Sequence, residues 1–230
     1  MISQKKASSY EAIYLELKDK ILHLELTPGS TISETDMAKQ YCISRTPIRD
    51  AFKALENDGL IEIRSHIGTF VTLIDMDQIA DMLYIRSTVE TAVISELASH
   101  YDPSMDYKIQ IALNDQLNLI DREYDQDSFA ADFIHSDNAF HGLLFELSGR
   151  KNVLGLLNSA NTQYERFRTF LNFENRDAVR VLYKQHEALY HALREGTEAD
   201  IKDLVAHHIY DGFNHNADIV LQYPNYFKTI

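Results

Sequence analysis

The sequence predicts a mainly α-helical protein with two domains. Residues 1–75 are expected to form a winged helix-turn-helix, three helices followed by a β-hairpin wing, and residues 76–230 an antiparallel all-α bundle of about six helices. Two observations lead to this fold class. Apolar residues recur at a helical period over most of the chain, and only residues 60–63 and 69–72 have the composition of short strands. A length of 230 residues is also comfortable for two domains.

The order of elements in the first domain is helix, helix, helix and hairpin. A first helix is expected over residues 10–26. Ser33 is a predicted N-cap of a second helix that reaches about residue 40. Ser44 can cap a third helix, which Asp58-Gly59 ends. A loop over residues 64–68 would then join the two strands of the wing.

The second domain has helical period almost throughout, up to about residue 222. Breaks between its helices are expected near residues 102–103, 125–127, 149–150, 172–175 and 195–196. Short connections of this kind are typical of antiparallel helices packed around one core.

Net charge is −13, but the two predicted domains carry it unequally. Residues 1–75 hold 9 basic and 11 acidic side chains, a net of −2, and residues 76–230 hold 13 and 24, a net of −11. A DNA-binding domain without surplus positive charge must gather its cations on one face. Non-specific affinity for DNA should therefore be modest and should fall steeply with salt.

Nothing in the chain points to a membrane or to an oxidising compartment. It has no run of eighteen apolar residues, and residues 10–26 mix charged with apolar residues instead of forming the apolar core of a signal peptide. A single cysteine, Cys42, excludes an internal disulfide. We therefore expect a cytoplasmic protein with no membrane partner.

The predicted third helix carries a row of cations. Arg45, Arg49 and Lys53 are four residues apart and share one face. A guanidinium fork matches O6 and N7 of guanine in the major groove, and base contacts concentrate at the N-terminal end of a recognition helix. An ordinary solvated face is the alternative. The apolar residues of this helix lie on another face and can pack inward: Ile48, Ala51, Phe52 and Leu55.

Ten histidines is a high count, and the apolar stripe of each helix separates inward from outward ones. Asp137 and His141 fall on the apolar face of one helix, four residues apart. His186 and His208 fall on the apolar faces of two others, whereas His207 points outward. A buried carboxylate is costly unless it is paired or bound to a cation, and three imidazoles with one carboxylate suit Zn²⁺ or another transition metal. Hydrogen-bonded core residues are the alternative.

A candidate effector site lies in the same domain. Arg86 and Glu90 are four residues apart on an inward face. One interpretation is a structural ion pair between them. The other is a binding site in which Arg86 binds the carboxylate of an effector and the metal coordinates the same carboxylate. Asn161 and Arg168 lie on inward faces too and complete the predicted effector-binding set.

Short motifs between positions 27 and 71 follow one order and spacing: Thr27-Pro28-Gly29, Ile32-Ser33-Glu34, Ser44-Arg45-Thr46-Pro47-Ile48-Arg49, Ala54-Leu55-Glu56, Gly59-Leu60-Ile61 and Gly68-Thr69-Phe70-Val71. They resemble the GntR family of bacterial regulators, to which the Ser-Arg-Thr-Pro-x-Arg run is specific. The resemblance implies that Arg45 and Arg49 contact bases or phosphates of the operator, and that the hydroxyls of Ser44 and Thr46 contact the DNA backbone. The wing tip would enter the minor groove, where Gly68 lets the protein backbone approach the DNA closely. Thr35 is a departure, since some relatives carry arginine there, so one contact is expected to be missing. The DNA-binding residues that the resemblance implies are Glu34, Ser44, Arg45, Thr46, Arg49, His66 and Gly68.

The second domain resembles the FCD-type ligand-binding domain of the FadR branch of that family, over residues 77–222. The matching residues are Asp137-Asn138-Ala139-Phe140-His141, His186-Glu187-Ala188-Leu189, His207-His208-Ile209 and the pair Arg86 and Glu90. In metal-containing members one Asp and three His hold the ion, and these map to Asp137, His141, His186 and His208. About six helices fits the shorter, VanR-like variant. The family's usual effectors imply a small organic acid or sugar acid.

Together these features predict a transcription repressor that binds double-stranded operator DNA as a homodimer. In most relatives effector binding releases DNA, but the sequence does not fix that direction here, and activation is the alternative. Zinc is the first choice for the metal, with nickel, manganese or iron as alternatives. We expect no enzymatic activity. A DNA-binding protein with a purely structural metal is one alternative. A metal-dependent hydrolase is another, although Glu187 and Glu90 are the only candidate general bases and neither is clearly placed.

Overall fold

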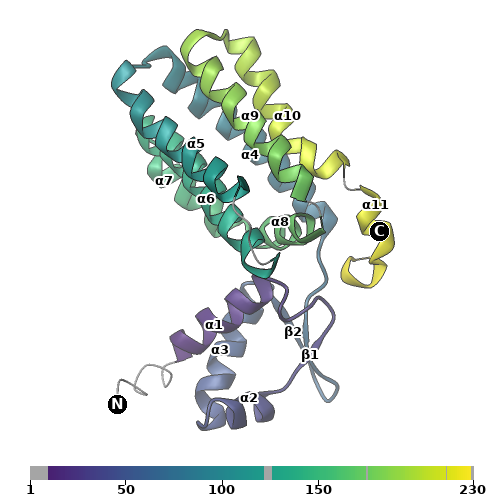
Figure 1. The fold of residues 1–230 in the computed structure, drawn as a ribbon. Coiled ribbons are helices and arrows are strands. Elements are labelled where there is room, and N and C mark those ends of the chain that lie inside the picture. Colours follow the sequence, from purple (N-terminus) through teal and green to yellow (C-terminus); the bar gives the residue numbers. More distant parts are fainter. Residues whose placement is uncertain (1–9, 122–125, 175, 216, 229–230) are drawn as a thin grey trace. The chain divides into compact units, whose positions relative to one another are not determined.

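The computed structural model describes residues 10–121, 126–174, 176–215 and 217–228. It confirms the expected fold class, mainly α-helical with one small antiparallel sheet (Figure 1). The chain divides into two compact units. The first unit comprises the chain up to Met76 together with the segment from Val220, and the second, the bundle, comprises Asp77–Ile219.

Three helices form the core of the first unit: α1 (Tyr10–Leu22), α2 (Glu34–Gln40) and α3 (Arg45–Asn57). Helices α1 and α3 pack against each other (Figure 1). Helix α1 ends at Leu22 rather than at residue 26. The reason is that Leu24 has a φ of 60°, which is incompatible with a right-handed α-helix. The buried face of α3 carries the four apolar residues that were expected to pack inward, Ile48, Ala51, Phe52 and Leu55. The buried face of α1 carries Ile13, Leu17 and Ile21, which are four residues apart.

The two predicted N-caps differ in the structure. Ser33 has extended backbone, and its Oγ accepts a hydrogen bond of 3.3 Å from the backbone N–H of Asp36 at the start of α2. Ser44 also has extended backbone before α3, but its side chain makes no capping hydrogen bond. Only Ser33 therefore satisfies one of the free N–H groups at a helix start.

The wing is a three-stranded antiparallel sheet in the order β1-β3-β2. Strands β2 (Ile61–Arg64) and β3 (Gly68–Val71) form the expected hairpin, and β1 (Thr31–Ile32) adds to the other edge of β3. Strand β1 was not expected, because two residues are too few to show an alternating pattern. At the hairpin turn His66 has a φ of 60° and Gly68 a φ of 149°.

The C-terminal segment joins the first unit. After helix α11 (Ala217–Gln222) and a 3₁₀ turn at Pro224–Tyr226, Phe227 forms a parallel β-bridge with Ile74. The backbone N–H of Lys228 donates to O of Ile74 at 2.9 Å, and Nζ of Lys228 lies 2.6 Å from Oδ2 of Asp75. Phe227 and Ile74 are both buried. Residues after 219 thus group with the first unit, whereas residues 76–230 were expected to form one domain.

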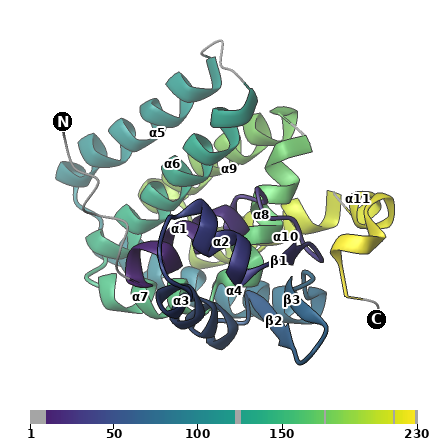
Figure 2. The ribbon, with the colours of Figure 1, turned by 90° about the horizontal axis from the view of Figure 1, so that it is seen from below.

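The described part of the bundle contains seven α-helices where about six were expected. Helices α5, α6 and α9 run side by side (Figure 2). The additional helix arises because α7 and α8 separate at Ala160 and Asn161, where neither glycine nor proline marks a break. The helix count therefore no longer favours the shorter, VanR-like variant. The seven helices are α4 (Met76–Ser99), α5 (Asp106–Asp121), α6 (Gln126–Leu147), α7 (Lys151–Ser159), α8 (Thr162–Glu174), α9 (Arg176–Glu195) and α10 (Glu198–His215).

Among the described helices, none combines the length and the apolar composition that a membrane crossing requires.

Candidate metal centre and DNA-reading helix

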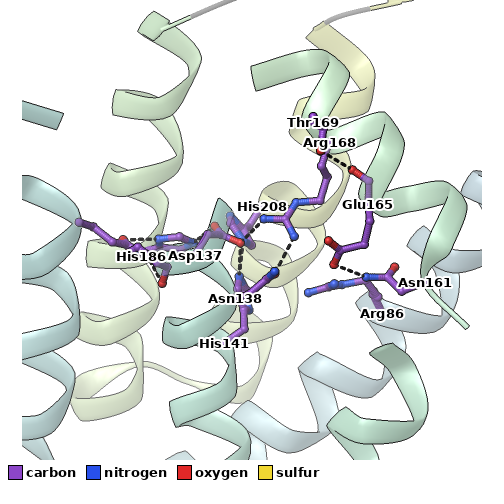
Figure 3. A network of polar contacts seen from close by, with 12 residues as sticks. Arg86, Asp137, Asn138, His141, Asn161, Glu165, Arg168, Thr169, His186 and His208 are labelled. Atoms are coloured by element: carbon purple, nitrogen blue, oxygen red, sulfur yellow. Dashed lines mark hydrogen bonds and ion pairs between the residues drawn. The ribbon is translucent and has the colours of Figure 1, made fainter. Parts of the chain in front are cut away.

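The four predicted metal ligands come together inside the bundle. Asp137 and His141 lie one turn apart on α6, His186 lies on α9 and His208 on α10, and all four are buried. One ligand atom from each lies within 4.8 Å of the others. Nε2 of His141 is 3.0 Å from Nε2 of His208, and Nε2 of His186 is 3.3 Å from Oδ1 of Asp137. Figure 3 shows these side chains converging.

Two buried glutamines hold the Nδ1 atoms of two of these histidines. Nε2 of Gln185 donates to Oδ2 of Asp211 at 2.8 Å, so its Oε1, 3.0 Å from Nδ1 of His208, must accept the proton of that ring. Oε1 of Gln116 lies 2.8 Å from Nδ1 of His186 in the same way. With Nδ1 protonated, each ring presents the lone pair of Nε2 to the centre of the cluster.

Glu90 lies against the third histidine as an ion-pair contact without hydrogen-bond geometry. Its Oε2 lies 2.8 Å from Nδ1 of His141, and its Oε1 accepts from Nε and Nη2 of Arg86 at 2.8 and 2.7 Å. Burial raises the pKa of Glu90, but the charge of Arg86 and the contact with His141 outweigh burial and hold that pKa well below its usual range. Glu90 is therefore a carboxylate that contacts a ligand histidine and pairs with Arg86.

The protonation of the cluster also suits a cation. Burial lowers the pKa of His186 to about 3, and burial together with the neighbouring imidazoles lowers the pKa of His208 well below its usual value. Burial raises the pKa of Asp137, but Arg168, whose Nη2 lies 2.5 Å from Oδ2, brings it below its usual range overall. Neutral imidazoles, as at His186 and His208, and an ionised carboxylate, as at Asp137, are the forms that bind metals.

A divalent transition metal fits these residues. Nε2 of His141 and Nε2 of His208 lie 3.0 Å apart, so either one of them donates a hydrogen bond to the other or both turn their lone pairs to a shared cation. Nε2 of His186 is buried without a hydrogen-bond partner among the described residues. Such orphaned buried atoms call for an explanation such as an ion. Nitrogen and carboxylate donors suit zinc, nickel, manganese or iron.

Two of the predicted effector residues, Arg86 and Arg168, lie over Tyr164, a side chain that its sequence context did not mark as functional. The guanidinium carbons of Arg86 and Arg168 lie 5.1 and 5.6 Å from the centre of the Tyr164 ring. Asn161 donates from Nδ2 to Oε1 of Glu165 at 3.0 Å, and its buried Oδ1 has no hydrogen-bond partner in the described part of the chain. Two cations thus lie beside the ligand cluster, Arg168 against Asp137 and Arg86 against Glu90 (Figure 3).

The glutamines Gln116 and Gln185 were also missed. Gln116 follows Ile109 and Leu113 on the buried face of α5, so its inward position could have been predicted from helical spacing. Which histidine it would hold depends on how α5 packs against α9, and no local pattern encodes that.

The predicted DNA-contacting residues lie on the open face of the first unit. Ser44, Arg45, Thr46 and Arg49 are exposed on and just before α3, while the apolar face of that helix is buried. At the wing tip His66 is exposed and Gly68 is half-buried. Glu34 instead forms ion pairs within the protein, with Nη2 of Arg45 at 2.9 Å and Nη2 of Arg49 at 3.3 Å.

Comparison with known proteins accords with this geometry. Residues 9–71 match the family described as "Bacterial regulatory proteins, gntR family", and residues 81–211 match the FCD domain. A Streptomyces ambofaciens HTH-type transcriptional regulator in an unstable DNA locus is 30% identical over 94% of this chain and 89% of its own. The HTH-type transcriptional repressor RspR of Escherichia coli is 28% identical over 86% of this chain and 85% of its own.

Solved structures share the fold. E. coli McbR/YncC matches with a TM-score of 0.64 at 17% identity, covering 96% of this chain and 99% of that one. A GntR regulator from Rhodococcus matches with a TM-score of 0.65 at 23% identity, covering 90% and 96%.

The winged helix-turn-helix and the helical second domain define a DNA-binding transcriptional regulator, not an enzyme, since the matching families and relatives are all regulators. The chain belongs to the GntR family and carries an FCD domain.

Proposed function

We propose that this regulator is a repressor whose FCD domain holds a divalent metal, zinc in the first instance, and senses a small carboxylate beside it. The observation that carries the proposal is the set of three Nε2 atoms and one carboxylate that converge within 4.8 Å. The name of the similar protein RspR, a transcriptional repressor, supports the direction of control. The regulator acts in the cytoplasm.

The bound metal would supply a positive centre that coordinates the effector's carboxylate. Arg168 and Arg86 then orient that carboxylate through charge-assisted hydrogen bonds, and Asn161 accepts a hydrogen bond from an effector hydroxyl through its free Oδ1. Glu90 contributes indirectly, through its contacts with His141 and Arg86. A small organic acid or sugar acid has this chemistry.

On the DNA side, we assign operator contacts to exposed residues of the first unit. Arg45 and Arg49 face the operator from α3, with the hydroxyls of Ser44 and Thr46 near its backbone. His66 and Gly68 bring the wing to the minor groove. A homodimer would hold two such units over a near-palindromic operator. Effector binding would change operator affinity by about five- to 150-fold, the usual size of such coupling.

The metal content of the purified protein, measured by mass spectrometry, tests the centre. Wild type and a His207→Ala control, which changes an exposed neighbour, should carry about one metal per chain. His186→Ala and His208→Ala should lose it while remaining folded. If no variant, wild type included, takes up zinc, nickel or manganese, the metal proposal is wrong.

Small carboxylates are then screened for their effect on the affinity of the zinc-loaded protein for operator DNA. An acid that weakens operator binding in the wild type, but not in an Arg168→Gln variant, supports the sensor. If chelation lowers the melting temperature and no carboxylate changes operator affinity, the metal is purely structural, which is the second candidate function.

A further inference from the structure

One acidic side chain, Glu34, pairs with both cations at the start of the recognition helix. Its Oε2 lies 2.9 Å from Nη2 of Arg45 and 3.3 Å from Nη2 of Arg49, and its Oε1 accepts from Nε of Arg49 at 3.5 Å. The side chain of Glu34 is 21% exposed, against 57% and 53% for the two arginines. The carboxylate at the start of α2 is thus less exposed to solvent than the two guanidinium groups that it pairs with.

The acid is held in its charged form. Burial raises the pKa of Glu34, but the hydrogen bonds and charges of Arg49 and Arg45 together lower it overall. Part of the donor capacity of each guanidinium is used by Glu34, and the remaining N–H groups are exposed to a ligand. A guanidinium has five donors, so this sharing leaves enough for a bidentate contact.

The carboxylate makes the two arginines poor partners for phosphate. A DNA phosphate that approached either guanidinium would bring a second anion close to Glu34, and like charges brought together in this way are destabilising. Guanine O6 and N7 are neutral acceptors, so a base edge avoids that repulsion and leaves both ion pairs intact. The ion pairs with Glu34 therefore favour contacts of Arg45 and Arg49 with base edges over contacts with DNA phosphates.

Lys53 provides the contrast. It lies one turn beyond Arg49 on the same face of α3, is exposed, and has no ion pair with any residue in the described part of the chain. An unpaired ammonium in that position is suited to a phosphate, which carries no sequence information.

We propose that Glu34 is a specificity-determining positioning residue, which acts through Arg45 and Arg49 by directing them to base edges and away from phosphates. The inference rests on the proposed role of the two arginines as operator contacts. It reassigns Glu34 from the DNA contact that the family resemblance implied to a residue that acts behind the contact.

The test compares Glu34→Gln with Asp36→Asn, a control that removes the same charge from the same helix. Asp36 is exposed and pairs with Lys39 at 3.4 Å, not with α3. Affinities are measured for an operator selected from a random-sequence library and for an unrelated duplex of equal length, each over a range of salt concentrations. Thermal melting of both variants establishes that they are folded.

Glu34→Gln should bind the unrelated duplex about fivefold more tightly than Asp36→Asn does, because every additional bond to a phosphate raises non-specific affinity. The slope of log affinity against log salt on that duplex should steepen by about one. The ratio of operator to unrelated affinity should fall about tenfold, because the arginines then bind base edges less often. Glu34→Asp, which keeps the carboxylate, should retain the wild-type slope and most of the ratio.

Two outcomes overturn the proposal. Equal behaviour of Glu34→Gln and Asp36→Asn on both duplexes would mean that Glu34 contributes only general charge. Loss of operator affinity with an unchanged salt slope on both duplexes would mean that Glu34 itself accepts from a base, such as N4 of cytosine. If instead Arg49→Gln leaves operator affinity unchanged, the proposed operator contacts fail, and that result is distinct from both.

Discussion

The imidazoles of His186 and His208 stay neutral in the folded bundle because burial lowers the pKa of each, to about 3 for His186. In the unfolded chain both titrate near pH 6.5. The unfolded state therefore binds more protons below that pH, and stability is lost as pH falls. We expect the free energy of unfolding of the metal-free protein to drop by roughly 2–3 kcal/mol per pH unit between about pH 6 and 4.

Urea denaturation of chelator-treated protein at a series of pH values measures this slope. His208→Gln should reduce it by about half, because one of the two shifted groups is removed. His207→Gln changes an exposed neighbour and should leave it unaltered. An identical slope in His208→Gln would show that the acid sensitivity has another source.

The glutamine behind a ligand histidine should matter for metal affinity. Gln185→Leu removes the acceptor that fixes Nδ1 of His208, and loss of such a partner typically weakens metal binding by about 10- to 100-fold. Competition with a zinc chelator measures the affinity. Gln110→Leu is the matched control, since Gln110 donates to the hydroxyl of Tyr190 and touches none of the four ligands. Equal zinc affinities would leave Gln185 as packing alone.

At the scale of elements, the two serines before α2 and α3 offer a matched comparison. Ser33→Ala removes a capping hydrogen bond and should cost about 1 kcal/mol of stability in the first unit. Ser44→Ala removes no such bond and should cost less than about 0.5 kcal/mol. Thermal or urea unfolding compares the two. A larger cost for Ser44→Ala would contradict the assignment of the caps.

The sequence reveals elements well when a whole face of one element is buried. Helix α3 was predicted over nearly its full length because its apolar residues repeat at helical spacing and Asp58-Gly59 marks its end. In the structure Gly59 has a φ of 70°. Strand β1 and the break before Asn161 were not predicted, since neither has a local signal.

The same distinction applies to the candidate site. Asp137 and His141 could be found because both lie on the apolar face of one helix, four residues apart. Gln116, Gln185 and Tyr164 act across helices, and their partners follow from packing between elements that are distant in sequence.

At the scale of the whole molecule, the C-terminal segment should stabilise the first unit. Phe227 is 4% exposed and bridges Ile74, so Phe227→Ala should cost about 3–5 kcal/mol in that unit. Leu221→Ala, at a side chain that is 77% exposed, should cost less than about 0.5 kcal/mol. Unfolding followed by amide hydrogen exchange reports the two units separately. Equal effects of both variants would mean that burial of the Phe227 side chain contributes little.

The pairing of Ile74 with Phe227 also determines when the first unit can be completed during synthesis. A ribosome makes the chain from its N-terminus, and domains usually fold as they emerge. Here the first unit begins at the start of the chain, yet its last contacts, between Ile74 and the segment at Phe227 and Lys228, require residues made after the entire bundle. A nascent chain therefore carries an unfinished DNA-binding unit until the FCD domain has been synthesised, and DNA binding by the finished unit follows the making of its sensor.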